Sequence, residues 1–469
     1  MDMTNYEPII GLEIHVELKT KSKMFCGCKA DWFGCVPNTL CCPVCLGLPG
    51  ALPVPNKKAV EWCVMLGLAL NCEIPEFSKF DRKNYFYPDL PKGYQISQYD
   101  KPFATSGWLD INNPINTNNP ILPINETMKK KIRIRRVHLE EDTGKLIHAT
   151  VDGKKCTLID FNRSGVPLVE VVTEPDMRSS NEARIFLKKL HQIIRYLGIS
   201  DADMEKGSMR LEPNISVRQI QNYNSKFKSE ELPKYKVEVK NINSFAFAKK
   251  AIDFEIARHI EILKRREIPV QETRGWDEKK GITYSQRSKE EAHDYRYFPE
   301  PDIPPIRWIG NQISNLKSQI CELPDKKLAR FMKEYGLSEY DATILTDTIE
   351  NADYFENSIK KITDNKQQIT PKTVANWIIN KKVDINKISS EELIKLISQQ
   401  SQKATISDEE LEKVIKKVIE ANPKAVSDYK SGKEQAIMFL VGQVMRETKG
   451  QGEANIIQQY LIKLLKNYD

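Results

Sequence analysis

The sequence predicts an α+β protein: a curved antiparallel-sheet cradle with flanking helices, followed by all-helical middle and tail domains. In the first part of the chain, several segments alternate apolar and charged residues with the period of two that strands require. Beyond the Pro-rich stretch that ends at Pro304-Pro305, apolar residues recur at helical spacing instead. We therefore expect a cradle domain at 1–298, a helical domain at 299–405 and a helical tail at 406–469.

Composition indicates a soluble globular protein with more than one domain. The 469 residues exceed what one ordinary core organises. Apolar and charged contents of 40% and 29% are ordinary for a folded chain. No apolar run reaches the roughly eighteen residues of a membrane-spanning helix. The N-terminus is acidic and lacks the apolar stretch of a signal peptide, so we expect a cytoplasmic protein.

The first strand, Ile9 to Leu18, carries the most informative pattern. Apolar residues alternate there with Glu13, His15 and Glu17, so the three polar side chains project from one face. Two carboxylates and an imidazole along one strand can share a cation or a phosphate–metal cluster. The alternative is a half-buried strand with a solvated outer face, although glutamate is depleted in strands.

The cysteines that follow have the spacing of a metal site. The chain has ten cysteines and no secretion signal, which favours thiols or metal over disulfides. A C-x-C pair and a C-x2-C pair, separated by thirteen residues, form a four-thiolate zinc pattern; its members are Cys26, Cys28, Cys42 and Cys45. No histidine or carboxylate leaves an open position, so the site is predicted to be structural. Buried free cysteines are the alternative.

Two stretches combine cations with aromatic or acidic residues. Cations alternate with aromatic residues from Lys79 to Asp89, a pattern that suits phosphate contact combined with base stacking. The alternative is that Phe86 and Tyr87 belong to the core. Basic residues crowd 129–136, which is a solvated face or a phosphate footprint. The net charge of +7, 71 basic minus 64 acidic residues, does not decide between them.

In the strand that begins at Lys131, the apolar residues change from even positions, Ile132 and Ile134, to odd positions, Val137 and Leu139. This change indicates a β-bulge. The strand ends in three consecutive carboxylates, Glu140 to Asp142, a second candidate cation site. Residues 111–127 are predicted to be a hairpin loop or insertion, and 158–173 a hairpin.

Ser179 and Glu182 have capping-box spacing at the start of a helix that Gly198 ends. Two further strands are predicted, each with one polar face. The polar face of the first is formed by Glu212, Asn214, Ser216 and Arg218, and that of the second by Lys236, Glu238 and Lys240.

In the helical tail, Ser407 and Glu410 are predicted to cap a helix, and a later helix is expected to begin near Lys433. Lys430 and Lys433 at its entry oppose the helix dipole, which indicates an external anion or simply solvated lysines.

The sequence has no phosphate loop, no Rossmann glycine motif and no nucleophile elbow. An enzyme of this sequence would work through carboxylates, cations and metal. A non-catalytic, zinc-containing tRNA-binding protein and a metal-dependent hydrolase or nuclease are the rival hypotheses.

Together, several long motifs coincide with one known family, and the match spans essentially the whole chain. They are Gly11 to Leu18, Lys79 to Asp89, His138 to Asp142, Ser208 to Ser216 and Asp294 to Asp302. The chain resembles the GatB family, the B subunits of the tRNA-dependent amidotransferase GatCAB.

The resemblance implies a ligase that is active as a complex with the GatA and GatC subunits. ATP activates the side-chain carboxylate of Glu-tRNA(Gln) or Asp-tRNA(Asn), and ammonia from glutamine hydrolysis in GatA gives Gln-tRNA(Gln) or Asn-tRNA(Asn). The cradle holds the reaction, and the helical domains grip the tRNA.

The resemblance also suggests roles for individual residues. We assign Mg²⁺ to Glu13, His15, Glu141 and Glu212, with Glu140 and Glu205 as further candidates. We assign the ATP phosphates to Lys79, Arg82 and Lys83. We assign the tRNA backbone to Lys430 and Lys433, and structural Zn²⁺ to Cys26, Cys28, Cys42 and Cys45.

Overall fold

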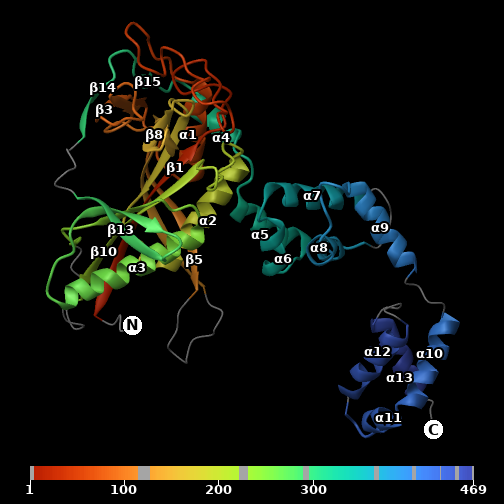
Figure 1. Ribbon diagram of the computed structural model, residues 1–469. Helices are drawn as coiled ribbons and strands as arrows, with labels where there is room; N and C mark the ends of the chain where they lie inside the picture. The colour runs from red at the N-terminus through yellow and green to blue at the C-terminus, as the bar shows by residue number, and fades with distance from the viewer. Residues whose placement is uncertain are drawn as a thin grey trace. The chain divides into compact units, whose positions relative to one another are not determined.

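The computed structural model describes residues 5–114, 127–220, 231–288, 295–363, 369–403, 408–433, 435–448 and 454–466. Its chain forms two compact units, Met1–Pro324 and Asp325–Asp469 (Figure 1). None of the helices in the described part is long and apolar enough to cross a membrane. Of the predicted loop at 111–127, residues 111–114 and 127 belong instead to two paired strands. Its remaining residues, 115–126, and the predicted cap Ser407 lie outside the described residues.

An eight-stranded sheet forms the centre of the first unit, in the order β13-β12-β11-β10-β1-β9-β6-β5. Only β11 and β12 run parallel among the pairs of this sheet; the other pairs are antiparallel. The strands are β1 (Tyr6–Glu17), β5 (Ala104–Pro114), β6 (Thr127–Glu141), β9 (Pro167–Thr173), β10 (Met209–Gln219), β11 (Val237–Lys240), β12 (Glu272–Asp277) and β13 (Ile282–Ser288). The predicted α+β class is confirmed.

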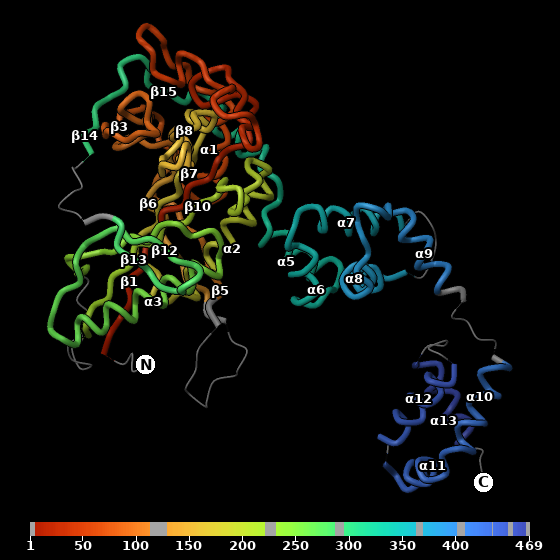
Figure 2. Tube along the Cα trace, viewed as in Figure 1, coloured from red at the N-terminus to blue at the C-terminus, as the bar shows by residue number. Residues whose placement is uncertain are grey.

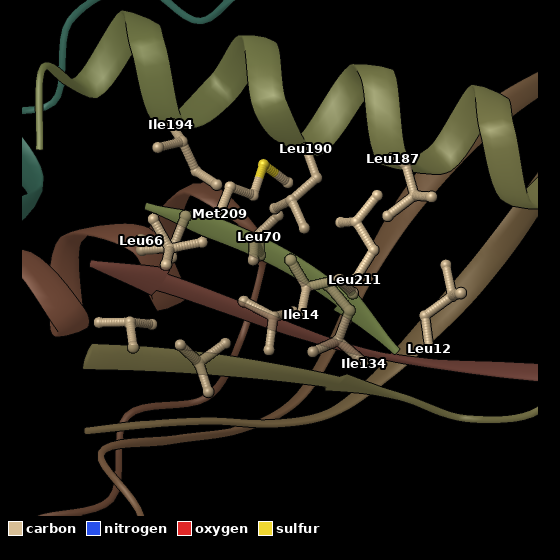
Figure 3. Packing of buried hydrophobic residues seen from close by; sticks show 14 of the residues in the cluster. Leu12, Ile14, Leu66, Leu70, Ile134, Leu187, Leu190, Ile194, Met209 and Leu211 are labelled. Atoms are coloured by element: carbon tan, nitrogen blue, oxygen red, sulfur yellow. The ribbon is translucent and has the colours of Figure 1, made fainter. Parts of the chain in front are cut away.

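Strand β1 lies inside this sheet, between β10 and β9. Figure 2 shows the red trace of β1 running upwards into the first unit from near the N-terminus. Its apolar face, which includes Ile10, Leu12 and Ile14, is fully buried. Three helices supply most of the opposing apolar side chains: α1 (Lys57–Ala69), α2 (Ser180–Leu197) and α3 (Phe245–Lys264). In Figure 3, Leu187, Leu190 and Ile194 of α2 point down onto the side chains of β1 and β10. The other face of the sheet therefore carries the polar residues.

Helix α2 begins and ends as the sequence predicts. The Ser179 side chain accepts a hydrogen bond from the backbone N–H of Glu182, which satisfies a donor that the first turn leaves free. Gly198 follows the last turn with φ of 65°, a left-handed conformation that glycine adopts without a steric penalty.

The predicted bulge in β6 is confirmed. The register between β6 and β9 shifts between Ile134 and Arg136. Before the shift Ile134 faces the core, and after it Val137 and Leu139 do. The shift therefore turns His138 and Glu140 onto the polar face beside β9, and it leaves Glu141 on the opposite side.

The predicted hairpin at 158–173 is wrong. Strand β8 (Lys154–Asp160) pairs with β7 (Lys145–Val151), whereas β9 joins the central sheet between β1 and β6. Asp152 and Gly153 join β7 to β8 with φ of 49° and 74°, the conformation that a tight hairpin turn requires. Strand β9 is buried throughout, so it needs neighbours on both edges and cover on both faces.

Smaller sheets complete the first unit. One has the order β14-β3-β4, formed by Arg296–Pro299, Asp81–Asn84 and Tyr94–Ser97. Another pairs β15 (Ile306–Arg307) with β2 (Phe77–Ser78). Helix α4 (Gln312–Ser318) adds Leu316 to the same core. These elements explain why the first compact unit continues beyond residue 298, and the three-domain division remains a prediction.

The second unit is helical. Its helices are α5 (Pro324–Tyr335), α6 (Glu339–Leu345), α7 (Ile349–Thr363), α8 (Pro371–Asn380), α9 (Ser390–Lys403), α10 (Asp408–Ala421), α11 (Pro423–Lys430), α12 (Gln435–Glu447) and α13 (Ala454–Lys466). One apolar cluster joins residues from Phe331 to Ile397, and a separate one joins residues from Leu411 to Leu465. Two cores fit the predicted middle and tail domains.

Candidate active site

Carboxylates and histidines from five neighbouring strands meet on the polar face of the central sheet. Two groups have possible ligand atoms within 4.8 Å of one another: His15, Glu140 and Glu170 in the first, and Glu13, Glu212 and Glu238 in the second. The pairing of β1 with its two neighbouring strands explains one contact in each group. His15 lies opposite Glu170 on β9, and Glu13 lies opposite Glu212 on β10. The predicted residues Glu13, His15 and Glu212 are therefore brought together.

His15 joins the two groups. Its Nε2 lies 3.4 Å from Glu170 Oε2 and 3.9 Å from Glu140 Oε1, and its Nδ1 lies 3.9 Å from Glu212 Oε1. Burial opposes the charged imidazole, but the three carboxylates outweigh it and raise the pKa of His15 to about 9. Nδ1 is buried on the side of Glu212 and has no hydrogen-bond partner among the described residues, so this nitrogen leaves a place that a ligand of the site would fill.

His138 supports the same group from β6. Its Nε2 lies 3.1 Å from Glu170 Oε2 and 3.8 Å from Glu140 Oε2. Burial raises the pKa of Glu170, yet the two histidines beside it hold that pKa well below the usual range. Glu170 is therefore a buried carboxylate that stays ionised, as a metal ligand must.

The second group is more exposed than the first, and a lysine partly neutralises its negative charge. Lys240 Nζ lies 3.0 Å from Glu212 Oε2. Asn214 donates to Glu13 Oε1 at 3.0 Å, and Thr273 on β12 donates to Glu238 Oε2 at 2.9 Å. Burial and the nearby Glu212 raise the pKa of Glu238 to about 7. The face thus gathers more negative charge than its lysines neutralise, and it suits a hard divalent cation.

Glu141 and Glu205, also predicted for this site, lie elsewhere. Glu141 faces away from His15, pairs with Lys92 and accepts the backbone N–H of Ile96 at 2.9 Å. It lines a cavity of about 190 Å³ together with Cys45. Glu205 is exposed in the loop before β10. After the bulge in β6, Glu141 lies on the same face as Val137 and Leu139, which is opposite to the face of Glu140.

Glu170 and Glu238 are functional candidates that sequence reasoning did not assign to the site, and Glu170 is the more deeply buried of the two. The strand of Glu170, Pro167–Thr173, is otherwise apolar except for its last residue. A lone carboxylate in the middle of a fully buried strand is costly unless it is paired. That cost was a signal available in the sequence, but the residues that pair with Glu170 are known only from the fold.

Of the three predicted phosphate-binding cations, only Lys83 faces the carboxylates. Burial opposes its charge, but Glu140 and the tyrosines around it raise the pKa of Lys83 well above its usual range. Its Nζ lies 4.7 Å from the centre of the Tyr295 ring. Lys79 instead pairs with Asp81 and with Asp100.

Arg82 also has a structural role, because two of its nitrogens contact Glu300 at 2.7 and 2.8 Å. Phe86 and Tyr87 in the same stretch are 94% and 55% exposed, so the core alternative for them is wrong.

Three of the six crowded cations of β6 are neutralised by carboxylates. Arg133 pairs with Asp176 and Arg135 with Glu174, each through two nitrogens, and Lys130 pairs with Glu182. These pairs favour the solvated-face alternative for these three residues.

The four predicted cysteines converge. The sulfur atoms of Cys26, Cys28, Cys42 and Cys45 lie within 4.8 Å of one another. The Cys26 thiol, the backbone N–H of Cys42 and Lys23 stabilise the Cys45 thiolate against the cost of burial, and its pKa is lowered to about 4. Lys23 Nζ is 3.7 Å from Cys45 Sγ and would partly offset the charge of a four-thiolate site. The donor set therefore fits zinc.

Removing one of these thiols should remove the metal. We expect Cys45→Ser to lose bound zinc and the knuckle to become sensitive to protease, because three thiolates do not close a structural tetrahedron. Metal content by mass spectrometry checks this. Cys35→Ser is the matched control, since Cys35 lies on the same loop outside the cluster. Equal zinc content in both variants would contradict the assignment.

In the tail, α12 begins at Gln435, and Lys430 is the last residue of α11. The predicted helix start near Lys433 is therefore two residues early. Lys430 lies where the helix dipole favours a cation, and Lys433 Nζ pairs with Asp428 at 2.9 Å. The dipole argument for an external anion no longer applies to Lys430.

Comparison with known proteins agrees with this arrangement. A family described as the GatB/GatE catalytic domain matches residues 8–314, and a second, described as the GatB domain, matches 388–465. This chain belongs to the GatB family. Its relatives include the B subunits of the aspartyl/glutamyl-tRNA(Asn/Gln) amidotransferases of Thermotoga maritima and Carboxydothermus hydrogenoformans. The Thermotoga protein is 45% identical over 98% of this chain and 99% of its own length. The Carboxydothermus protein is 46% identical over 98% of each chain.

These matches confirm the family that the motifs indicated and the tRNA-dependent amidotransferase function that it implies. They do not favour the hypothesis of a non-catalytic tRNA-binding protein. The GatB/GatE catalytic domain match covers every residue of the two carboxylate groups and of the cysteine cluster.

Proposed function

We propose that this GatB chain activates the side-chain carboxylate of Glu-tRNA(Gln), Asp-tRNA(Asn) or both by phosphorylation from ATP. Ammonia released from glutamine by a GatA subunit then displaces the phosphate and forms the amide. The observation that carries the proposal is the buried His15–Glu170–Glu140 group beside the second carboxylate group, on one face of the sheet. Phosphoryl transfer depends mainly on positioning and charge neutralisation, and this face supplies both.

Magnesium is the cation that fits the carboxylate face. We assign it to His15, Glu140 and Glu170, with Glu13, Glu212 and Glu238 around a second position, and we no longer include Glu141. The buried, ionised Glu170 fits a metal ion at the first position, and the unpartnered Nδ1 of His15, which faces Glu212, fits one at the second. Bound Mg²⁺ would neutralise phosphate charge and orient the oxygens of ATP.

The protein's own cations would complete the phosphate site. Lys83 Nζ lies against the Tyr295 ring, and the charge of Glu140 acts on it. Lys240 reaches the carboxylate face from β11. We propose that Lys83 contacts the transferred phosphate, while the ion pairs of Lys79 and Arg82 hold strand β3 and the residues before it in place.

Lys83→Gln is expected to lower the rate of ATP cleavage about 100-fold, because it removes a positive charge from a partly buried phosphate site. Tyrosine and carboxylate neighbours keep the shape of the site. Single-turnover ADP release measures the effect. Lys79→Gln is the matched control and should change the rate less than about threefold, since Lys79 is occupied by Asp81 and Asp100. Equal losses in both variants would refute the assignment.

The proposal also includes the partners and the compartment. We propose a cytoplasmic heterotrimer with GatA and GatC subunits, in which the helical unit binds the body of the tRNA and Lys430 and Lys433 contact its backbone. The helical unit carries its own apolar cores, so it can form a separate binding module.

The test is reconstitution with GatA and GatC partners, ATP, Mg²⁺ and glutamine, with each mischarged tRNA supplied in turn. We expect ADP release that depends on a mischarged tRNA, together with Gln-tRNA or Asn-tRNA formation. Glutamine hydrolysis without ADP release for either tRNA would overturn the proposed function.

A further inference from the structure

A pair of aromatic residues on the cysteine-bearing loop is surrounded by cations and has no part in the site described so far. Trp32 is buried, whereas Phe33 is 52% exposed, and their rings meet edge to face with centres 5.8 Å apart. Lys145 Nζ lies 5.3 Å from the Trp32 ring centre and 5.8 Å from that of Phe33. Lys206 Nζ lies 5.9 Å from the Phe33 ring centre. We call Trp32, Phe33, Lys145 and Lys206 the platform.

The loop that carries Trp32 and Phe33 is anchored. Asn38 of the same loop donates to the backbone carbonyl of Ile159 and, through its own N–H, to Asp160 Oδ1, both at 3.0 Å. The backbone N–H of Leu40 donates to Asn162 Oδ1 at 2.7 Å. The C-terminal part of the loop is thus fixed to the end of β8 and to the residue that follows Phe161.

The platform is also continuous with the carboxylate face. Trp32 Nε1 donates to Glu17 Oε2 at 3.1 Å. Glu17 is two residues from His15 on the same side of β1, a separation of roughly 7 Å. The Trp32 ring, against which Phe33 packs, is thus hydrogen-bonded to the same strand that carries His15.

Its charges are available for an anion. Lys145 has no carboxylate within ion-pair distance among the described residues, and Lys206 pairs only at 3.5 Å with the partly exposed Asp203. An exposed ring flanked by lysines binds single-stranded nucleic acid by base stacking and phosphate contact.

We propose that the platform binds the unpaired 3′ end of the substrate tRNA, with a base stacked on Phe33 and phosphates at Lys145 and Lys206. This inference rests on the proposed function, because the amino acid to be activated is attached to that end. Bound here, the end would direct the aminoacyl group along β1 towards His15.

A double-mutant cycle in the reconstituted heterotrimer tests the proposal. Affinity is measured for intact tRNA and for tRNA that lacks its unpaired 3′ nucleotides, with wild type and Phe33→Ala. We expect Phe33→Ala to weaken binding of intact tRNA about tenfold and to leave binding of truncated tRNA unchanged. The double variant Lys145→Gln/Lys206→Gln should lose about two phosphate contacts with intact tRNA. The slope of log affinity against log salt concentration should therefore decrease in magnitude by about two.

Controls separate this inference from folding and from the proposed function. Val36→Ala removes an apolar side chain that is 70% exposed on the same loop and should leave both affinities unchanged. Phe33→Leu keeps an apolar side chain without a π face and should behave like Phe33→Ala while zinc remains bound.

Equal weakening for intact and truncated tRNA would overturn the proposal, as would a change only in the KM for ATP. The binding measurement does not depend on catalytic activity. An inactive wild-type complex would therefore refute the proposed function, while the affinities would still test the platform.

Discussion

Replacing His15 by alanine is expected to reduce ATP-dependent activation of the mischarged tRNA at least about 100-fold, while the GatA partner still hydrolyses glutamine. The variant removes the one side chain that contacts both carboxylate groups. Without it, Glu140, Glu170 and Glu212 repel one another, and a bound cation loses a ligand. Single-turnover ADP release and Gln-tRNA formation in the reconstituted complex measure the effect.

Glu170→Gln should give a loss of similar size, because it keeps the shape of the side chain and removes the charge that both histidines contact. Glu174→Gln is its matched control. Glu174 follows β9, where it pairs with Arg135 near the surface, and such pairs contribute about 1 kcal/mol or less. If His15→Ala activates the substrate normally, β1 is only scaffold, and the site should be sought around the cavity that Glu141 lines.

The second large effect concerns stability. Glu255→Gln is expected to lower the free energy of unfolding of the first unit by about 2–3 kcal/mol, since it removes the buried carboxylate that Arg258, Arg274 and His259 share, although both arginines keep Glu272. Glu255 on α3 is fully buried; its carboxylate lies 2.7 Å from Arg258 and 3.1 Å from Arg274, and it pairs with His259. Chemical denaturation followed by circular dichroism measures the change.

The same network makes stability fall in acid. Burial raises the pKa of Glu255, but His259 and Arg258 outweigh it and lower that pKa to about 2. The stabilisation is therefore complete above the ordinary carboxyl pKa and is lost as pH falls from about 4.5 towards 2. Burial also lowers the pKa of His259, so acid favours the unfolded chain there as well, beginning below about pH 6.5.

Glu255→Gln should flatten the stability profile below about pH 4.5. Glu261→Gln, on the exposed side of the same helix, pairs only with Lys264 and is the control, with an expected change within about 0.5 kcal/mol. A Glu255→Gln variant as stable as this control at pH 7 would show that the buried pairs contribute no net stability.

Local patterns determined a large part of this protein. The period of two from Leu12 to Leu18 fixed a strand with one polar face, and the cap at Ser179 and the stop at Gly198 fixed a helix. The spacing of Cys26, Cys28, Cys42 and Cys45 was enough to predict that the four thiols converge. These features depend on residues close in sequence, whose geometry the backbone itself sets.

Tertiary structure alone decided which distant residues meet. Glu170 contacts His15 because β9 inserts between β1 and β6, although the sequence suggested that its segment turns back on β8. The alternation of Val137 and Leu139 after the predicted bulge already indicated that Glu140 and Glu141 lie on opposite faces, but only the fold shows that β6 lies beside β9, which brings Glu140 to Glu170. The choice of neighbouring strands minimises exposed backbone and apolar surface over the whole sheet, so no local pattern specifies it.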